Sequence, residues 1–196
     1  SINSVTGTIT PNTSTPGSYT VTYDIAATGG CPSFSTTTSV TIGDTSAPSL
    51  TVPPTKNIEC SDSKLPANTG QATSTDNCTA SPTITYSDVT VNGNCTGRYT
   101  ITRTWTSTDG YGNSTTGTQT INVDDTTPPV INCPANVTVQ TPSDIPEVDT
   151  AQVTVSDNCG GIVTKNFVIE TYTDIFNNPG FCPTSVQRIY QATDAC

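Results

Sequence analysis

Asp124-Asp125-Thr126-Thr127-Pro128-Pro129 is the stretch around which the sequence is organised, because a related stretch, Asp44-Thr45-Ser46-Ala47-Pro48, begins 81 residues before Asp125. Prolines remove backbone donors and fix φ, so they end a strand and stiffen the chain that follows. We therefore interpret both stretches as joints between copies of one module. The predicted domains are residues 1–44, the C-terminal half of a repeat; 45–125, a complete repeat; and 126–196, a C-terminally incomplete repeat.

The composition favours strands and excludes two classes of partner. The chain is rich in Thr, with 14 Gly, 15 Pro, no Met and no His, so we expect almost no helix. A formal charge of -10 with only 6 Lys and Arg argues against binding to nucleic acid or to a membrane. Eight cysteines without a metal-binding spacing predict disulfides, and therefore a secreted, extracellular protein. We expect any targeting signal to lie outside these residues.

One strand pattern occurs three times. In Gly17–Ile25 apolar and polar residues alternate, which predicts a half-buried strand, and Thr37–Ile42 follows as its antiparallel partner. The pattern recurs in Tyr99–Thr106 and in Val186–Ala192. The other strands expected in the middle repeat are Ser49–Val52, Asn57–Cys60, Gly70–Thr75, Thr83–Val89 and Thr116–Val123. Short strands in this number predict an all-β chain of small sandwiches.

Several motifs resemble a known family. Thr75-Asp76-Asn77-Cys78, the strand that runs on to Asp109, and Cys133-Pro134-Ala135-Asn136 resemble the HYR-like, Ig-fold repeats of long cell-surface adhesins of the Bacteroidetes, in particular the SprB-type gliding-motility adhesins. The segment from Thr6 to Cys31 resembles a second repeat type of the same proteins. The resemblance implies tandem Ig-like β-sandwich repeats in an extended rod, with neighbouring repeats of the same chain as partners.

The predicted disulfides come from a comparison of the repeats with each other. Cys133 and Cys196 stand where the middle repeat has Val52 and Tyr111, so both cysteines are absent there together, which pairs Cys133 with Cys196. The cysteine positions that the two repeats share favour two further bridges, Cys78–Cys95 and Cys159–Cys182. Each bridge would stabilise a thin core by about 3 kcal/mol.

One geometric objection leaves an alternative open. If Thr83–Val89 is a straight strand at about 3.3 Å per residue, then Cys78 and Cys95 begin at its opposite ends. Cys60 with Cys95 is therefore the second choice; otherwise Cys60 has no obvious partner. We expect Cys31 to pair with a cysteine upstream of Ser1.

Acidic residues are expected to gather at the joints. In an Ig-type order of strands, the N-terminus of a repeat and two of its loops lie at one end. Those positions hold Asp44, Asp76 and Asp109 in the middle repeat, and Asp125, Asp157 and Asp194 in the next. Oxygen ligands of this kind suit Ca²⁺, which we expect at each joint. The alternative is that these aspartates cap turns by binding their own backbone.

Two arginines and two threonines also stand out. Arg103 and Arg188 lie on the apolar face of their strands, so we expect each to stack on an aromatic ring or to pair with a carboxylate, with a ligand role as the alternative. Asp125-Thr126-Thr127 and Asp149-Thr150-Ala151 resemble the O-glycosylation acceptor motif of the Bacteroidetes. This resemblance implies glycans on Thr126 and Thr150.

No catalytic nucleophile can be paired with a base, because the chain has no His and its cysteines are expected in disulfides. We interpret the chain as a non-enzyme, the stalk repeats of an adhesin fibre that by resemblance serves gliding motility and surface attachment. A carbohydrate-binding or accessory module of a secreted protein is the alternative, with surface polysaccharide as ligand. Aromatic residues between Phe167 and Phe181, in a connection six residues longer than its counterpart, would favour it if they are exposed, whereas buried rings would simply fill the core of the third repeat. A surface-layer or filament subunit is a third possibility.

Overall fold

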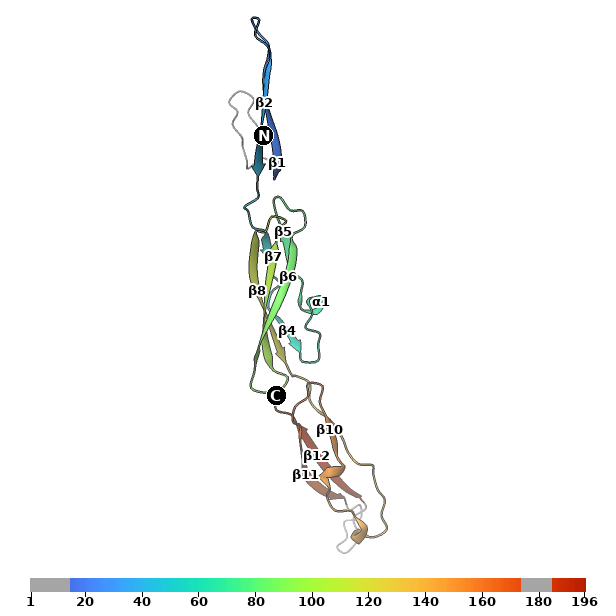
Figure 1. The fold of residues 1–196 in the computed structure, drawn as a ribbon. Helices are drawn as coiled ribbons and strands as arrows, with labels where there is room; N and C mark the ends of the chain where they lie inside the picture. The colour runs from blue at the N-terminus through green and yellow to red at the C-terminus, as the bar shows by residue number, and fades with distance from the viewer. Residues whose placement is uncertain (1–14, 174–184) are drawn as a thin grey trace. The chain divides into compact units, whose positions relative to one another are not determined.

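Strands make up most of the regular structure (Figure 1). The computed structural model describes residues 15–173 and 185–196. Within them α1 (Pro66–Thr69) is a single helical turn, and two 3-10 turns cover Pro142–Asp144 and Thr150–Gln152. The prediction of an all-β chain with almost no helix is confirmed. No helix in this part of the chain is long and apolar enough to cross a membrane.

β1 (Gly17–Ile25) and β2 (Phe34–Ile42) form an antiparallel hairpin, as the alternating pattern predicts. The turn between them contains Gly29 and Gly30 with φ of 58° and 87°. Glycine suits this region of backbone conformation because it has no Cβ. Tyr23 on β1 is 63% exposed, so the hairpin by itself buries little apolar surface.

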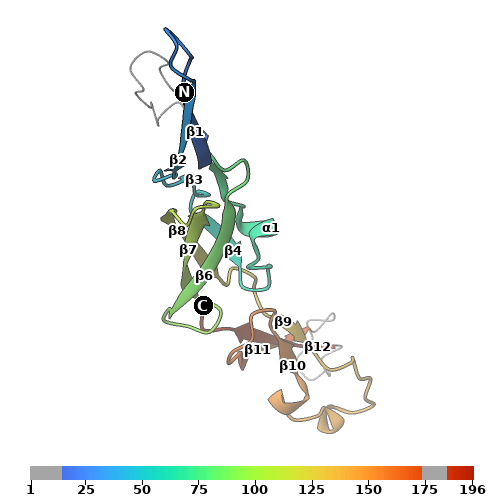
Figure 2. The same ribbon diagram turned by 45° about the horizontal axis from the view of Figure 1, so that its top comes forward.

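The middle repeat contains a small sheet and a larger one (Figures 1 and 2). In the small sheet, β3 (Ser49–Thr51) pairs antiparallel with β5 (Thr73–Thr75). The larger sheet has the order β4-β8-β7-β6, in which β4 runs parallel to β8. Its strands are β4 (Lys56–Glu59), β6 (Thr83–Asn92), β7 (Tyr99–Thr108) and β8 (Ser114–Asp124). All six strands overlap the ranges predicted from the sequence.

The chain divides into two compact units, whose boundaries cross the strands of the larger sheet. One unit contains the residues up to Pro53 with Gln71–Asp88 and Arg103–Gln119, and the other contains Pro54–Gly70, Val89–Thr102 and Thr120–Cys196. In the second unit, the side chains of four β-branched residues form a buried apolar cluster: Ile58, Ile101, Ile121 and Val123.

Trp105, in the first unit, is the largest fully buried side chain among the described residues. It is 1% exposed and donates its indole N–H to the side-chain oxygen of Gln119 at 3.3 Å. Arg103 is also 1% exposed, makes two hydrogen bonds of 2.8 Å to Asp88, and lies 4.4 Å from the ring centre of Tyr86. The prediction for Arg103 is confirmed in both of its forms, the aromatic stack and the carboxylate pair.

In the predicted third repeat (126–196), the described residues form two pairs of antiparallel strands. β9 (Val130–Asn132) pairs with β10 (Thr154–Ser156), and β11 (Thr164–Thr173) pairs with β12 (Ser185–Thr193). The predicted strand Val186–Ala192 lies inside β12. Arg188, which lies on β12, forms an ion pair with Glu170 at 2.9 Å. The side chain of Arg188 is 21% exposed. The predicted carboxylate partner of Arg188 is therefore present.

Candidate metal centres at the two joints

Three aspartates converge at the first joint. Asp44 follows β2, Asp76 follows β5 and Asp109 follows β7, and all three belong to the first compact unit. One carboxylate oxygen of each lies within 4.8 Å of one from each of the others. The ends of three strands thus bring together the three residues that the repeat comparison predicts at this joint.

Asp44 and Asp76 each use only one carboxylate oxygen to cap their own turn. Asp44 Oδ1 accepts the N–H of Ser46 at 3.0 Å, and Asp76 Oδ2 accepts the N–H groups of Cys78 and Thr79 at 2.8 Å each. The second oxygens, Asp44 Oδ2 and Asp76 Oδ1, are buried and have no hydrogen-bond partner. Turn capping, the alternative explanation, accounts for one oxygen of each of these two carboxylates. It does not account for the second oxygen of Asp76, and near Asp44 the thiol of Cys78 also hydrogen-bonds to the carboxylate.

Asp109 is the most buried member of this cluster, at 7% exposure. Its Oδ1 accepts the N–H groups of Tyr111 and Asn113 at 2.8 Å, and its Oδ2 accepts the side-chain N–H of Asn113 at 2.7 Å. Burial opposes ionisation of Asp109, but these hydrogen bonds outweigh it and lower the pKa of the carboxyl. The same Asn113 amide donates to the backbone carbonyl of Asp44 at 3.1 Å, which ties the chain after β2 to the loop after β7.

At the second joint, Asp125 and Asp157 form a cluster with Cys159 inside the second compact unit. Asp157 Oδ1 accepts the N–H of Cys159 at 2.8 Å, in the same turn that Asp76 makes. Asp125 Oδ1 and Asp157 Oδ2 are buried without a hydrogen-bond partner. Asp125 is 6% exposed, so its carboxylate is more than nine-tenths buried.

Burial is the main reason why the pKa of Asp125 is raised, and the charge of Asp157 adds to it. Asp194 and Glu59 lie near enough to raise this pKa further. Asp194 Oδ1 accepts the N–H of Cys196 at 2.9 Å, which matches the bond from Tyr111 to Asp109 at the first joint. The six predicted aspartates thus lie at corresponding places of the two joints, but the clusters differ: Asp44, Asp76 and Asp109 converge at the first, whereas at the second Asp125 and Asp157 converge with Cys159, and Asp194 is not part of the group.

The disulfides differ from the predicted ones. Cys60 is bonded to Cys159, with their Cα atoms 5.5 Å apart, and Cys95 is bonded to Cys196, with a Cα separation of 5.7 Å. Both bridges connect a residue of the predicted 45–125 repeat to a residue of the predicted 126–196 repeat. The predicted pairs Cys133–Cys196, Cys78–Cys95 and Cys159–Cys182 are therefore wrong, and so is the second choice, Cys60 with Cys95.

Two physical reasons explain the error. The ten-residue strand β6 separates Cys78 from Cys95, and ten residues of strand span about 33 Å, whereas a disulfide needs Cα atoms within about 7 Å. In addition, paired loss identifies partners only if both cysteines belong to one repeat, and these bridges join successive repeats. Cys182 lies outside the described residues; within them Cys31, Cys78 and Cys133 have no disulfide.

The thiol of Cys78 lies beside the first cluster. Burial raises its pKa, and the negative charge of Asp44, a hydrogen bond from the thiol to that carboxylate, and the charges of Asp76 and Asp109 add to the effect. The thiol is therefore protonated at neutral pH. Cys78 occupies the position of Cys159, so the first joint keeps a free thiol where the second has half of a disulfide.

Glu59 is a residue of the second joint that the sequence analysis missed. Its carboxylate accepts the hydroxyl of Thr126 at 2.6 Å and the side-chain N–H of Asn158 at 3.3 Å. The hydrogen bond from Thr126 is the main cause of its lowered pKa. The signal was its neighbour Cys60, a cysteine left without a partner. Thr126 and Thr150 remain predicted glycosylation sites, and the Thr126 hydroxyl is engaged by Glu59.

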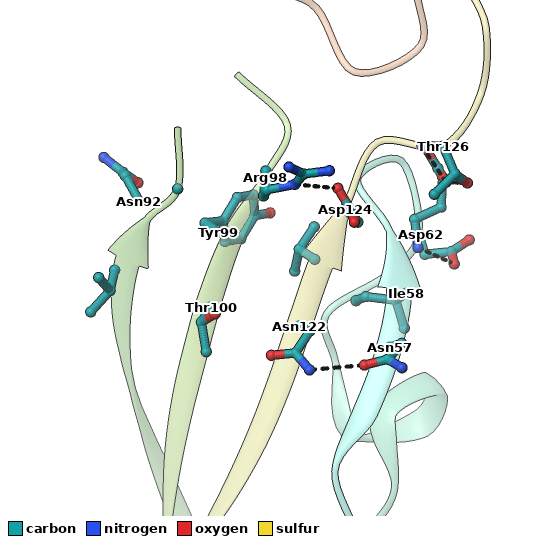
Figure 3. Close-up of a pocket in the computed structure, with 14 residues that line it drawn as sticks. Asn57, Ile58, Asp62, Asn92, Arg98, Tyr99, Thr100, Asn122, Asp124 and Thr126 are labelled. Atoms are coloured by element: carbon teal, nitrogen blue, oxygen red, sulfur yellow. Dashed lines mark hydrogen bonds and ion pairs between the residues drawn. The ribbon is translucent and has the colours of Figure 1, made fainter. Parts of the chain in front are cut away.

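An open depression of about 820 Å³ lies at one end of the larger sheet, within the second unit (Figure 3). Arg98 points toward Asp124 there and binds it at 2.7 Å, and Asn122 donates to Asn57 at 2.9 Å. Tyr99 supplies an apolar wall beside these pairs. Because the polar groups named here bind each other, this depression offers a ligand less than the acidic clusters do.

The aromatic residues of the third repeat are divided between packing and exposure. Phe167 packs against Tyr190 with ring centres 5.8 Å apart. Tyr172 is 63% exposed and donates its hydroxyl to Glu170. Phe181 lies outside the described residues. Of the aromatic residues of this connection that the structure describes, Phe167 is thus packed and Tyr172 exposes its ring.

Comparison with protein-family models and with curated proteins finds no match to this chain. Its function is therefore inferred from the joints and the disulfides described above.

Proposed function

We propose that the chain is a run of stalk repeats in an extracellular, cell-surface adhesin fibre, which serves surface attachment and gliding motility. In this proposal residues 45–125 and 126–196 are tandem Ig-like sandwiches, residues 1–44 belong to a preceding repeat, and the repeats form an extended rod. The stalk is not an enzyme, and its partners are the neighbouring repeats.

The observation that carries the proposal is the pair of disulfides that join one repeat to the next, Cys60–Cys159 and Cys95–Cys196. Disulfides persist in oxidising compartments, which supports a location outside the cytoplasm. Adjacent domains of one chain are by default free to move relative to each other. Two covalent bridges between successive repeats restrict that freedom, which is a property that a stalk needs.

The charge of the chain also supports this assignment. With a net charge of -10 and 6 basic residues, the surface repels other copies of itself and remains hydrated. A long fibre needs such a surface because many identical repeats stand close together on one cell. A subunit of a surface layer or filament would instead associate with itself, and sedimentation of the oxidised chain at increasing concentration distinguishes the two.

The location is tested on intact cells of the source organism. Antibodies raised against the purified chain should label unpermeabilised cells, and external protease should remove the label while an internal control protein survives. Labelling only after permeabilisation would contradict the proposal. Small-angle scattering of the oxidised chain tests the rod, since a compact globule with a single core would exclude tandem sandwiches.

A carbohydrate-binding module is the second candidate, because Tyr172 exposes most of its ring on β11. Exposed aromatic rings offer an apolar face on which a sugar can stack. Titration with surface polysaccharide of the source organism should then show binding that Tyr172→Ala abolishes. Tyr23→Ala, which removes an equally exposed tyrosine from β1, is the matched control.

A further inference from the structure

At both joints some carboxylate oxygens are buried and receive no hydrogen bond from the turn that their residue caps. Asp125 Oδ1 and Asp157 Oδ2 are buried and unpartnered, and one carboxylate oxygen of Asp125 lies within 4.8 Å of one of Asp157. A buried ionised oxygen without a hydrogen bond or counter-charge is costly, and two such oxygens side by side add mutual repulsion. A group of the opposite charge between them would remove both penalties.

We propose that Asp125 and Asp157 bind one Ca²⁺ ion at the second joint, and that Asp44, Asp76 and Asp109 bind another at the first. The carboxylate oxygens of each cluster lie within 4.8 Å of one another. Two oxygens that share a Ca²⁺ ion at 2.3–2.6 Å stand at most about 5.2 Å apart. The spacing of the clusters therefore fits direct coordination of one ion.

The donor atoms favour calcium over softer metals. The ligands at both joints are carboxylate oxygens, which are hard donors. At the second joint the sulfur atoms of Cys60 and Cys159 are bonded to each other, so neither is a thiolate that could hold zinc. Magnesium requires a near-ideal octahedron and keeps its water, whereas carboxylates from separate strand ends form an irregular site that suits the larger ion.

The basic side chain near the second cluster does not take the place of the ion. Arg98 interacts with the charge of Asp125, but its guanidinium is bound to Asp124 at 2.7 Å. Asp124 also accepts the backbone N–H of Asp125 at 3.0 Å. The counter-charge of this arginine is thus used by the residue next to the cluster, and the buried oxygen of Asp125 remains without a partner.

An ion at these positions would connect segments that the strands alone leave separate. At the second joint it would link the end of β8 to the turn after β10, which belong to successive repeats. At the first it would link the segments after β2, β5 and β7. This inference goes beyond the proposed stalk function and does not depend on it, since calcium can order joints in any extracellular tandem protein.

The test is calorimetric titration of the metal-stripped, oxidised 196-residue chain with CaCl₂. We expect two sites per chain, with affinities between about 10⁻⁵ and 10⁻³ M. Asp125→Asn should weaken one site at least about tenfold and leave the other unchanged, and Asp76→Asn should do the converse. Circular dichroism and Trp105 fluorescence confirm that each variant is folded.

Asp149→Asn is the matched control. Asp149 also caps a turn, but both of its oxygens have partners, the backbone N–H of Ala151 at 2.8 Å and the side chain of Gln152 at 3.2 Å. This variant should bind two calcium ions like the unaltered chain. The proposal is overturned by absence of binding at 5 mM CaCl₂, by equal binding of magnesium, or by equal loss in Asp149→Asn. Any of these results would leave surface labelling of cells, and with it the stalk assignment, unaffected.

Discussion

The two joints present equivalent carboxylates, but only the second is crossed by disulfides. Asp76 and Asp157 make the same turn with the backbone of the cysteine two residues on, and each keeps one oxygen unpartnered. At the first joint that cysteine, Cys78, is free, whereas at the second Cys159 is bonded to Cys60. The aspartate turn therefore forms whether or not its cysteine is in a disulfide, so the carboxylates and the disulfides can be altered independently.

The comparison indicates that the carboxylate clusters and the disulfides restrict different motions of the chain. The carboxylates bring together strand ends that already lie close, whereas each bridge closes a loop of about 100 residues, with sequence separations of 99 and 101. Loop closure mainly restricts the unfolded chain. We expect the second joint to be the more stable of the two, and the first to depend on its non-covalent contacts.

Removal of a bridge is expected to have the largest effect. The double variant Cys60→Ser with Cys159→Ser should lose about 2–4 kcal/mol of unfolding free energy, below the limit of about 4.7 kcal/mol for a loop of 100 residues because the second bridge remains. Hydrogen exchange should accelerate in β10 to β12 and stay unchanged in β1 and β2. Equal acceleration at both joints would show that the disulfides do not distinguish them.

The arginine pairs inside the repeats should give the next largest effect. Asp88→Ala leaves Arg103, which is 1% exposed, without its carboxylate; since Asp88 itself is 31% exposed, we expect a loss of about 2–3 kcal/mol. Glu170→Ala removes the partner of the more exposed Arg188 and should cost clearly less. Urea unfolding measures both. A larger loss for Glu170→Ala would mean that burial does not set the strength of these pairs.

A smaller effect is expected from the threonines at equivalent positions of the two joints. Thr126 donates its hydroxyl to Glu59 at 2.6 Å, whereas Thr45 is exposed. Thr126→Val should lower the midpoint of thermal unfolding by about 2 °C, and Thr45→Val should leave it unchanged. If both variants shifted the midpoint of thermal unfolding equally, the hydrogen bond to Glu59 would not distinguish the second joint from the first.

The smallest effect is expected in the pH dependence of folding stability. It comes from Glu170, which lies within the third repeat and not at a joint. Hydrogen bonds from Tyr172 and then Arg188 lower the pKa of Glu170 below its ordinary value of 4.5. A carboxyl with a lowered pKa stabilises the fold above pH 4.5 and loses that contribution as the pH falls through its folded-state pKa. Glu170→Gln should flatten this acid limb of a stability profile. An unchanged limb would assign it to other carboxylates.

The strands and the aspartate positions could be predicted because they depend on local patterns. Alternation in Gly17–Ile25 identifies β1 directly, and repetition of the Asp-Asn-Cys turn places Asp76 and Asp157 at equivalent strand ends. The approach of Asp109 to Asp44 followed from the order of strands in one repeat.

The disulfides could not be predicted in the same way, because a comparison of repeats identifies equivalent positions but not contacts between one repeat and the next. The unpaired Cys60 was the single indication of such a contact. The carboxylate partner of Arg103 was also out of reach, since Asp88 lies on a neighbouring strand whose register is set by packing around Trp105.

The bridges also limit how far the chain can be stretched. In the oxidised chain the bridge from Cys95 to Cys196 is the shorter route for a pulling force applied at the two ends, so the 101 residues of that separation add nothing to the greatest length that the chain can reach. At about 3.4 Å per extended residue, about 340 Å of chain is held in reserve. An unfolded repeat under load would therefore remain a disulfide-closed loop. Its residues could extend to their full length only after a reducing agent had cleaved the bridge.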